Sequence, residues 1–206
     1  RDAYFIAGGG SSPVGVLGYV DAGLELAMQV ERKEMPLPKV IYLAVGSGGT
    51  LGGLVLGLRL AGLNTRVVGI QVAPRIFANP KVALRLARKA LKRMRRHDRS
   101  VPELALTEAD MPMEAAYYGA GYGHPTDGAR RALALMARTE GIDLELTYTA
   151  KTLSGLLHKV RSEGEKGPTL FLNTFNSVDL SRMADRVKPG QLPEEFHRFF
   201  EGKLGE

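Results

Sequence analysis

Five consecutive residues have the composition of a loop that binds an anion. They are Gly46, Ser47, Gly48, Gly49 and Thr50, called the glycine loop below. Glycine adopts positive φ angles and lets backbone N–H groups approach a ligand closely. An apolar run, Val40–Val45, precedes the loop and a helical pattern follows it. The loop would therefore present the unpaired N–H groups of a helix N-terminus, together with two hydroxyl donors, which predicts a phosphate site.

The glycine loop differs from two common nucleotide-binding patterns. It is not a Walker loop, because no Gly-Lys-Ser or Gly-Lys-Thr follows. A dinucleotide fingerprint would begin at Gly46, but the position of its third glycine is taken by Leu51. The next expected strand ends in Gln71 and Val72 rather than in an acid that holds a ribose. Two alternatives remain: a turn that binds nothing, and a non-catalytic ligand- or dinucleotide-binding domain.

Strand and helix patterns alternate along the chain. We expect strands at residues 4–7, 40–45, 66–72 and 168–174. We expect helices at residues 13–33, 50–61, 80–99, 125–139, 149–161 and 192–204. This alternation predicts an α/β fold with a mostly parallel sheet. Ligands of such folds bind at the carboxyl ends of the strands, where we expect the turns Gly8–Ser12, Gly46–Thr50 and Asn173–Ser177 to converge.

Composition limits the classes of protein. A chain of 206 residues with 44% hydrophobic and 24% charged residues can form one sizeable globular core. The sequence has no cysteine, which excludes disulfides, cysteine-ligated zinc and cysteine catalysis; no metal site is predicted. No charge-free stretch is long enough to cross a membrane and no secretory signal is visible. The default expectation is a cytoplasmic protein without a membrane partner.

The positive charge is concentrated in one expected helix. Residues 80–99 contain nine Lys or Arg and one Asp, a net +8 against −2 for the rest of the chain. Leu84, Ala87, Leu91 and Met94 fall on one face of this helix. We therefore interpret the segment as a solvated basic face. A nucleic-acid or acidic-membrane surface is the alternative, but no aromatic residue is interleaved for base stacking, so no nucleic-acid partner is expected.

Four segments together resemble a known family. They are residues 9–26 ("GGSSPVGVLGYVDAGLEL"), 45–58 ("VGSGGTLGGLVLGL"), 117–157 (from "YYGAGYGHPTDG" to "TYTAKTLSGLL") and 170–174 ("LFLNT"). In this order they resemble the D-cysteine desulfhydrase and 1-aminocyclopropane-1-carboxylate deaminase family of pyridoxal-phosphate enzymes. The resemblance covers most of residues 1–175. It implies the tryptophan-synthase-β-like fold, a three-layer α/β domain with helices on both faces of the sheet. It also implies pyridoxal 5'-phosphate as cofactor, a small amino-acid substrate and a homodimer.

The resemblance assigns roles to individual residues. It implies that the glycine loop holds the cofactor phosphate and that Tyr122 and Tyr148 line the substrate pocket as catalytic residues. It places Thr149 and Thr174 near the pyridine nitrogen of the cofactor. The deaminase branch typically has Glu at the position of Thr149. A neutral threonine leaves the ring a weaker electron sink than a carboxylate does, which suits elimination of a good leaving group.

These roles predict a reaction. We expect α,β-elimination from a D-amino acid such as D-cysteine, giving pyruvate, ammonia and sulfide, with 1-aminocyclopropane-1-carboxylate deamination as the alternative. Two departures from the family affect this expectation. Phe175, Asn176 and Ser177 replace the usual glycines, and Ser12 replaces the usual Asn.

The family's Schiff-base lysine lies upstream, in an Asn-Lys pair beside a small domain, and this chain contains no Asn-Lys pair. The chain also begins with Arg rather than Met. We therefore expect residues 1–206 to be most of the large cofactor-binding domain, with the N-terminal segment, the small domain and that lysine outside them. Four other lysines, Lys33, Lys39, Lys81 and Lys151, are interpreted as surface or helix residues.

Overall fold

A computed structural model of the chain describes residues 3, 5–162, 164, 166–176, 178, 183 and 193. Residues 1–175 form one compact unit and residues 176–206 form a second. All the helices and strands named below belong to the first unit. The predicted helix at residues 192–204 lies outside the described residues, apart from Pro193.

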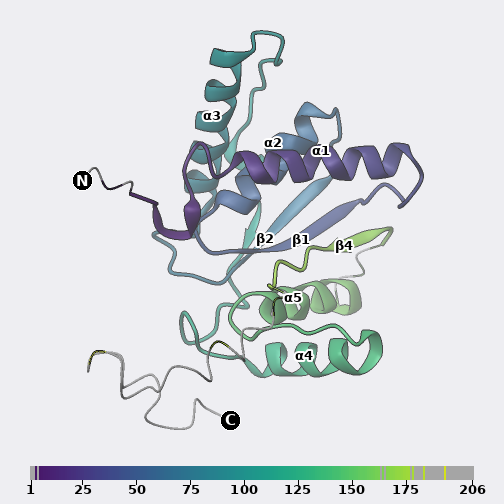
Figure 1. Cartoon of the computed structure of the whole chain (residues 1–206). Helices are drawn as coiled ribbons and strands as arrows, with labels where there is room; N and C mark the ends of the chain where they lie inside the picture. Colours follow the sequence, from purple (N-terminus) through teal and green to yellow (C-terminus); the bar gives the residue numbers. More distant parts are fainter. Residues whose placement is uncertain are drawn as a thin grey trace. The chain divides into compact units, whose positions relative to one another are not determined.

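A four-stranded parallel sheet lies at the centre of the first unit (Figure 1). Its strands, in chain order, are β1 (Val40–Val45), β2 (Arg66–Gln71), β3 (Met113–Glu114) and β4 (Thr169–Phe171). They lie side by side in the order β3-β2-β1-β4, and each neighbouring pair is parallel. Val40 is paired with Arg66 on one side and with Thr169 on the other. The carboxyl ends of the strands therefore meet at one edge of the sheet, as the sequence predicts.

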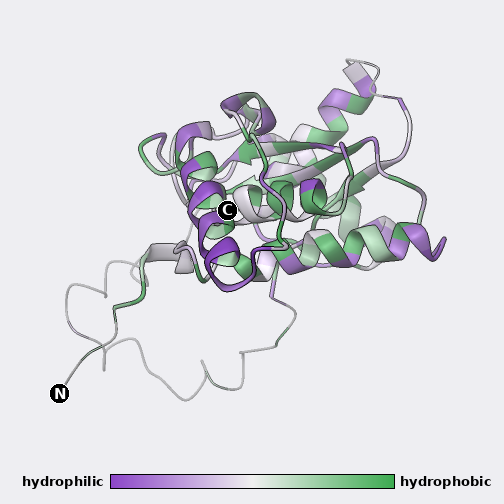
Figure 2. Ribbon diagram, turned by 90° about the horizontal axis from the view of Figure 1, so that it is seen from above, coloured by the Kyte–Doolittle hydropathy of each residue, from purple (hydrophilic) through white to green (hydrophobic). Residues whose placement is uncertain are grey.

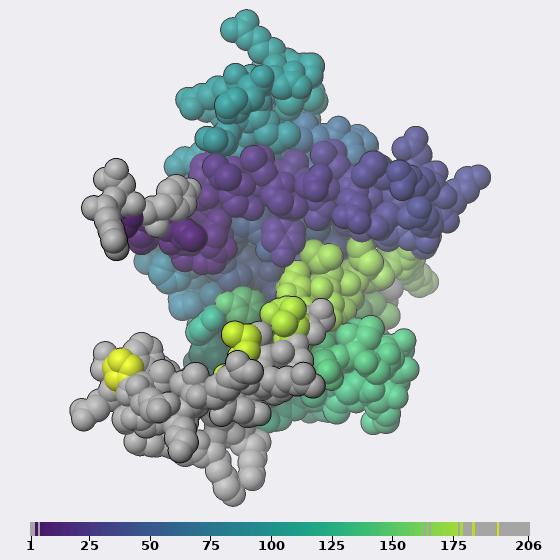
Figure 3. Space-filling view, viewed as in Figure 1, coloured from purple at the N-terminus to yellow at the C-terminus, as the bar shows by residue number. Residues whose placement is uncertain are grey.

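Helices cover both faces of this sheet (Figure 1). One layer contains α1 (Leu17–Glu31), α2 (Gly49–Leu60) and α3 (Pro80–His97), and the other contains α4 (Asp127–Glu140) and α5 (Thr149–Ser162). Two short 3-10 helices, η1 (Gly8–Gly10) and η2 (Glu108–Asp110), lie in the connections. On the face shown in Figure 3, α1 lies across α2 and covers most of it. The three-layer α/β fold expected from the sequence is confirmed.

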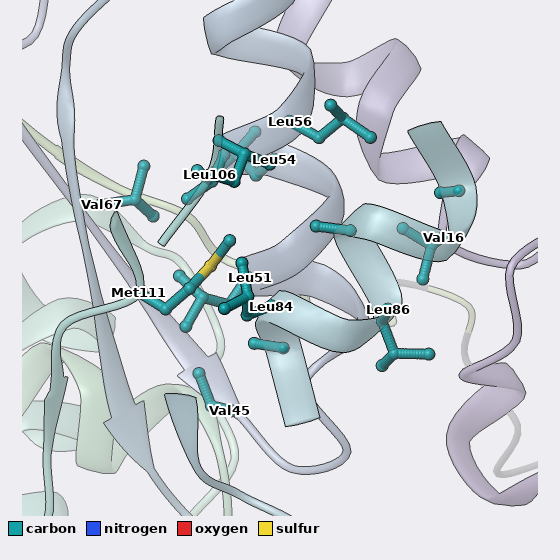
Figure 4. Close-up of a cluster of buried hydrophobic side chains, with 14 of the residues drawn as sticks. Val16, Val45, Leu51, Leu54, Leu56, Val67, Leu84, Leu86, Leu106 and Met111 are labelled. Carbon is teal, nitrogen blue, oxygen red and sulfur yellow. The ribbon is translucent and has the colours of Figure 1, made fainter. Parts of the chain in front are cut away.

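The sheet divides the core into two parts because neighbouring residues of a strand face opposite sides. Ile41 and Leu43 belong to the cluster packed on α1, α2 and α3, part of which Figure 4 shows. Val40 and Tyr42 belong to the cluster on the α5 side. All six residues of β1 are buried, which explains why its sequence is continuously apolar. In Figure 2 hydrophobic colours follow the strands and hydrophilic colours the outer faces of the helices.

Three element predictions are wrong in position or extent. The described residues of the expected strand at 4–7 are not in a strand, and Phe5 and Ile6 are exposed, because no neighbouring strand pairs with them. The first long helix begins at Leu17 rather than Pro13, because residues 13–16 form turns. The strand expected at 168–174 is limited to Thr169–Phe171.

The basic segment forms α3 as expected. Asn79 caps the helix by accepting a hydrogen bond from Val82 N–H at 3.0 Å, and the apolar face of α3 packs on α2. A hollow of about 480 Å³ lies beside its charged face. Its lining consists of Lys81, Leu84, Arg85, Arg88, Lys89, Lys92 and Glu108. Within the described part of the chain, none of the helices is long and apolar enough to cross a membrane.

Candidate functional site

The glycine loop connects β1 to α2 at the carboxyl edge of the sheet, and its neighbours explain its glycines. Gly48 has a φ of 84°, a left-handed conformation that favours glycine. A Cβ atom at Gly48 would lie 3.2 Å from the backbone nitrogen of Ala83. At Gly49 a Cβ would lie 2.7 Å from Ser11 Oγ. The loop is therefore closely surrounded, and side chains at these positions would displace their neighbours.

The N-terminus of α2 carries N–H groups without partners inside the helix. The first backbone hydrogen bond of this turn runs from Gly52 N–H to Gly48 O at 3.0 Å. The N–H groups of residues 49–51 precede it and have no partner inside the helix. Gly48, which precedes the helix, has no side chain with which to cap them. Several N–H donors, the helix dipole and the hydroxyls of Ser47 and Thr50 form a donor set that fits a phosphate group.

A second loop packs against the glycine loop. Ser11 Oγ lies 2.6 Å from Ser47 Oγ, so the two hydroxyls share a hydrogen bond. A Cβ atom at Gly9 would collide with Ser47 Oγ, which shows how closely the loops approach. Two of the three turns expected at the carboxyl edge, Gly8–Ser12 and Gly46–Thr50, are thus in contact.

Two tyrosines form a pair next to the glycine loop. Tyr122 OH and Tyr148 OH lie 2.9 Å apart, and the rings meet edge to face with centroids separated by 6.0 Å. Tyr148 comes from the turn before α5, and Tyr122 comes from the connection between β3 and α4. A Cβ atom at Gly46 would lie 3.2 Å from Cε1 of the Tyr148 ring. The structure therefore brings both predicted tyrosines together at the start of the glycine loop.

The environment of Tyr148 favours its neutral form. Burial raises the pKa of the Tyr148 phenol above its usual value, and the hydrogen bond to Tyr122 and the negative charge of nearby Glu145 raise this pKa further. Tyr148 therefore keeps its proton at neutral pH. It can donate a hydrogen bond to an anionic group, but it is not poised to act as a base.

Glu145 holds the first turn of α5, and the sequence analysis did not identify it. Its carboxylate accepts hydrogen bonds from the backbone N–H groups of Thr147, Tyr148 and Thr149 at 2.6–2.7 Å. Thr149 Oγ1 accepts in return from the backbone N–H of Glu145 at 3.0 Å. A carboxylate at a helix N-terminus also interacts favourably with the helix dipole. The signal available in the sequence was an acidic residue just before a predicted helix.

Lys151 has an environment that the sequence did not predict. It is on a helix, as expected, but it is fully buried rather than on the surface. Its Nζ donates hydrogen bonds to the backbone oxygens of Tyr118 at 2.7 Å and Gly121 at 3.3 Å. Burial lowers the pKa of the Lys151 ammonium, and the negative charge of Glu145 acts in the opposite direction. Its burial was not predicted, and it arises because the connection before α4 folds over this side chain.

The two predicted threonines have different surroundings. Thr149 is 1% exposed, and its hydroxyl is occupied by Glu145. Thr174 is exposed and lies three residues beyond the end of β4, towards the carboxyl edge of the sheet. Among the described residues the Thr174 hydroxyl has no hydrogen-bond partner. A role for either hydroxyl near a cofactor ring stays a prediction.

Comparisons with known proteins found a matching family, similar sequences and a similar fold. Residues 1–174 match the model of a family described as pyridoxal-phosphate dependent enzyme. The D-cysteine desulfhydrases of Salmonella paratyphi B and Salmonella schwarzengrund are each 34% identical to the chain over 174 residues, which is 83% of this chain and 49% of each relative. The crystal structure of an ACC deaminase homologue has a TM-score of 0.66 and 28% identity, over 86% of this chain and 50% of that one. The chain thus spans about half the length of the curated relatives that it matches.

Proposed function

The chain belongs to the family of pyridoxal-phosphate dependent enzymes, and from this membership we propose that the protein is a lyase acting on a D-amino acid such as D-cysteine. D-cysteine and water would give pyruvate, ammonia and hydrogen sulfide. The observation that carries this proposal is the Tyr122–Tyr148 pair beside Gly46, because it places two phenols next to the loop that fits a phosphate. The relatives named D-cysteine desulfhydrase support the choice of substrate.

Pyridoxal phosphate is the cofactor of this family, and it supplies an electron sink for charge that develops at the substrate α-carbon. We assign its phosphate to the glycine loop. The N–H groups at the start of α2 and the hydroxyls of Ser47 and Thr50 would donate to the phosphate oxygens. Ser11 holds the Ser47 hydroxyl through their shared hydrogen bond. Thr174, at the same edge of the sheet, is the proposed partner of the ring nitrogen.

The tyrosine pair would bind and orient the amino acid. Tyr148 keeps its proton, so its phenol can donate to the substrate carboxylate. Tyr122 is 54% exposed and hydrogen-bonded to Tyr148, so it can close the site towards solvent. When Tyr148 donates its one proton to the carboxylate, the Tyr122 O–H can donate to the Tyr148 oxygen. Loss of the α-proton requires a base other than Tyr148, because a phenol with a raised pKa accepts no proton at neutral pH.

Deamination of 1-aminocyclopropane-1-carboxylate is the second candidate, and the ACC deaminase homologue of similar structure favours it. Thr149 argues for elimination instead. A threonine cannot place a negative charge beside the cofactor ring, and the Thr149 hydroxyl is already occupied by Glu145. A modest electron sink is sufficient when a thiolate leaves, whereas ring opening has no such leaving group.

Release of 2-oxo acid from the two substrates tests the proposal. The full-length protein, saturated with pyridoxal phosphate, is assayed with D-cysteine, L-cysteine and 1-aminocyclopropane-1-carboxylate. We expect pyruvate and sulfide from D-cysteine, much less from L-cysteine, and little 2-oxobutanoate from the cyclopropane. Ring opening at least as fast as elimination would assign the protein to the deaminase branch. Bound cofactor with no reaction on any of the three would refute both candidates.

A further inference from the structure

Lys151 is a buried cation with an unusual set of partners. Its side chain is completely buried, and Nζ donates to two backbone carbonyls, Tyr118 O at 2.7 Å and Gly121 O at 3.3 Å. Nζ also lies 5.4 Å from the centroid of the Tyr118 ring, within the range of a cation–π contact. In the described part of the chain Lys151 makes no ion pair within 4.0 Å. The carbonyls and the aromatic face therefore contact the ammonium directly, and the Glu145 carboxylate acts on it from a longer distance.

Both carbonyls belong to one glycine-rich segment, residues 115–126, called the tyrosine loop below. Gly119 and Gly123 have φ angles of 72° and 77°, and glycine loses more conformational entropy on folding than other residues. The loop's own backbone hydrogen bonds include Tyr118 N–H to Ala115 O at 3.1 Å and His124 N–H to Gly121 O at 3.3 Å. A loop of this kind needs contacts from outside to hold one conformation.

Lys151 is close in the chain to one member of the tyrosine pair and binds the residue before the other. Gly121, whose carbonyl Lys151 binds, directly precedes Tyr122 in the chain. Lys151 is also three residues after Tyr148, so one turn at the start of α5 carries both the lysine and the phenol that Tyr122 contacts. The tyrosine loop is therefore attached to α5 at three places: its backbone to Lys151, its Tyr122 phenol to Tyr148, and Tyr117 OH to His158 Nδ1 at 2.8 Å.

We propose that Lys151 is a positioning residue that holds the tyrosine loop against α5, so that the Tyr122 phenol faces the substrate site. The expected effect of Lys151 on catalysis rests on the function proposed above. The expected effect of Lys151 on the loop does not. A charge would be retained in this buried position because an ammonium donates several hydrogen bonds at once. A neutral apolar side chain of the same length would fill the volume, but it would remove the lysine donor from Tyr118 O and leave Gly121 O with the His124 N–H alone.

The first measurement does not depend on catalysis. Chymotrypsin cleaves after tyrosine, and the loop contains Tyr117, Tyr118 and Tyr122. In the full-length protein, we expect Lys151→Met to be cut within the loop at least about 10-fold faster than wild type, because cleavage follows the population of the open loop. The control is Arg161→Met on the same helix, an exposed cation with no hydrogen bond or ion pair to the described residues. We expect its loop to be cut at the wild-type rate.

The second measurement separates positioning from a general loss of structure. With Lys151→Met, we expect the KM for D-cysteine to rise about 10-fold or more while kcat changes less, because misplacement of a binding group weakens substrate orientation. Cofactor absorbance should stay at the wild-type level, because the glycine loop is on a different element. Lys151→Gln keeps an amide donor, so its loop cleavage and KM should lie between those of wild type and Lys151→Met.

These outcomes distinguish the two proposals. Wild-type loop cleavage in folded Lys151→Met overturns the role of Lys151, whatever the substrate. Faster loop cleavage with no turnover of D-cysteine by wild type supports the loop attachment and refutes the proposed substrate. If Lys151→Met does not fold, Lys151→Gln decides by the same two measurements. Wild-type values for both measurements in that variant overturn the proposal.

Discussion

Glu145 and Thr149 bind each other's backbone at the start of α5. Glu145 Oε1 accepts from the Thr149 N–H at 2.7 Å, and Thr149 Oγ1 accepts from the Glu145 N–H at 3.0 Å. Tyr148 lies inside this arrangement, and its own N–H donates to the same carboxylate. The direction in which the Tyr148 phenol points therefore depends on a residue that does not touch the glycine loop.

Replacement of Glu145 by Ala should destabilise the domain. Three backbone N–H groups lose a charged acceptor, and loss of a helix cap costs about 1–2 kcal/mol. The free energy of unfolding, measured with urea, should fall by this amount, and Glu145→Gln should recover part of it. Asp143→Ala, two residues away and exposed, is the matched control. Equal effects of Glu145→Ala and Asp143→Ala would show that the cap contributes nothing.

Replacement of Gly48 by Asp should abolish cofactor binding. The substitution places a carboxylate where the phosphate is expected, and its Cβ would lie 3.2 Å from the Ala83 backbone. The control is Gly62→Asp at the other end of α2. Gly62 has a φ of 76°, similar to the 84° of Gly48, and no atom lies within 4 Å of the position of its Cβ. Cofactor absorbance should be lost in the first variant and kept in the second. Normal cofactor absorbance in Gly48→Asp would show that the phosphate does not bind at this loop.

Local sequence patterns were sufficient to predict much of this fold. The apolar run at residues 40–45 predicted the buried strand β1, and the alternation of strand and helix patterns predicted the parallel sheet. The family resemblance seen in four sequence segments is confirmed by the match over residues 1–174. The expected strand at residues 4–7 failed because a strand depends on a neighbour, which no local pattern supplies.

The site was predictable only in part, for a related reason. The glycine loop has a local sequence signature, and the two tyrosines were predicted from the family resemblance. Lys151 has no such signature, because its burial depends on a loop about 30 residues earlier in the chain. Glu145 was missed because its carboxylate reaches forward to three N–H groups across a turn, a pattern that differs from the common capping box.

The charged face of α3 should bind duplex DNA weakly. Its cations are spread along one exposed helix face, and Arg88 is already engaged with Leu106 O at 2.6 Å. Non-specific phosphate contacts of this kind are lost as salt rises to about 150 mM. Fluorescence anisotropy with a labelled duplex, measured at low and physiological salt, checks this expectation. Lys89→Glu with Lys92→Glu should remove the low-salt binding. Tight binding that persists at physiological salt would make α3 a nucleic-acid surface.

The stability of the domain at alkaline pH should depend on Tyr148. Burial and the Tyr122 hydrogen bond raise the pKa of the Tyr148 phenol in the folded protein, whereas an unfolded tyrosine titrates near about 10. Above this pH the unfolded chain loses the proton and the folded chain keeps it, so the free energy of unfolding falls as pH rises. This contribution is complete below the unfolded pKa and is lost progressively above it.

Tyr148→Phe should therefore make the free energy of unfolding fall less steeply as pH rises. Between about pH 9 and 11, the free energy of unfolding of wild type should fall more steeply than that of Tyr148→Phe, because Phe has no proton to lose. Tyr122→Phe removes one of the groups that raise the Tyr148 pKa, so its slope should lie between the other two. Urea unfolding at several pH values gives the three slopes. Identical slopes for wild type and Tyr148→Phe would mean that the phenol titrates alike in the folded and unfolded states, and would contradict the raised pKa of Tyr148.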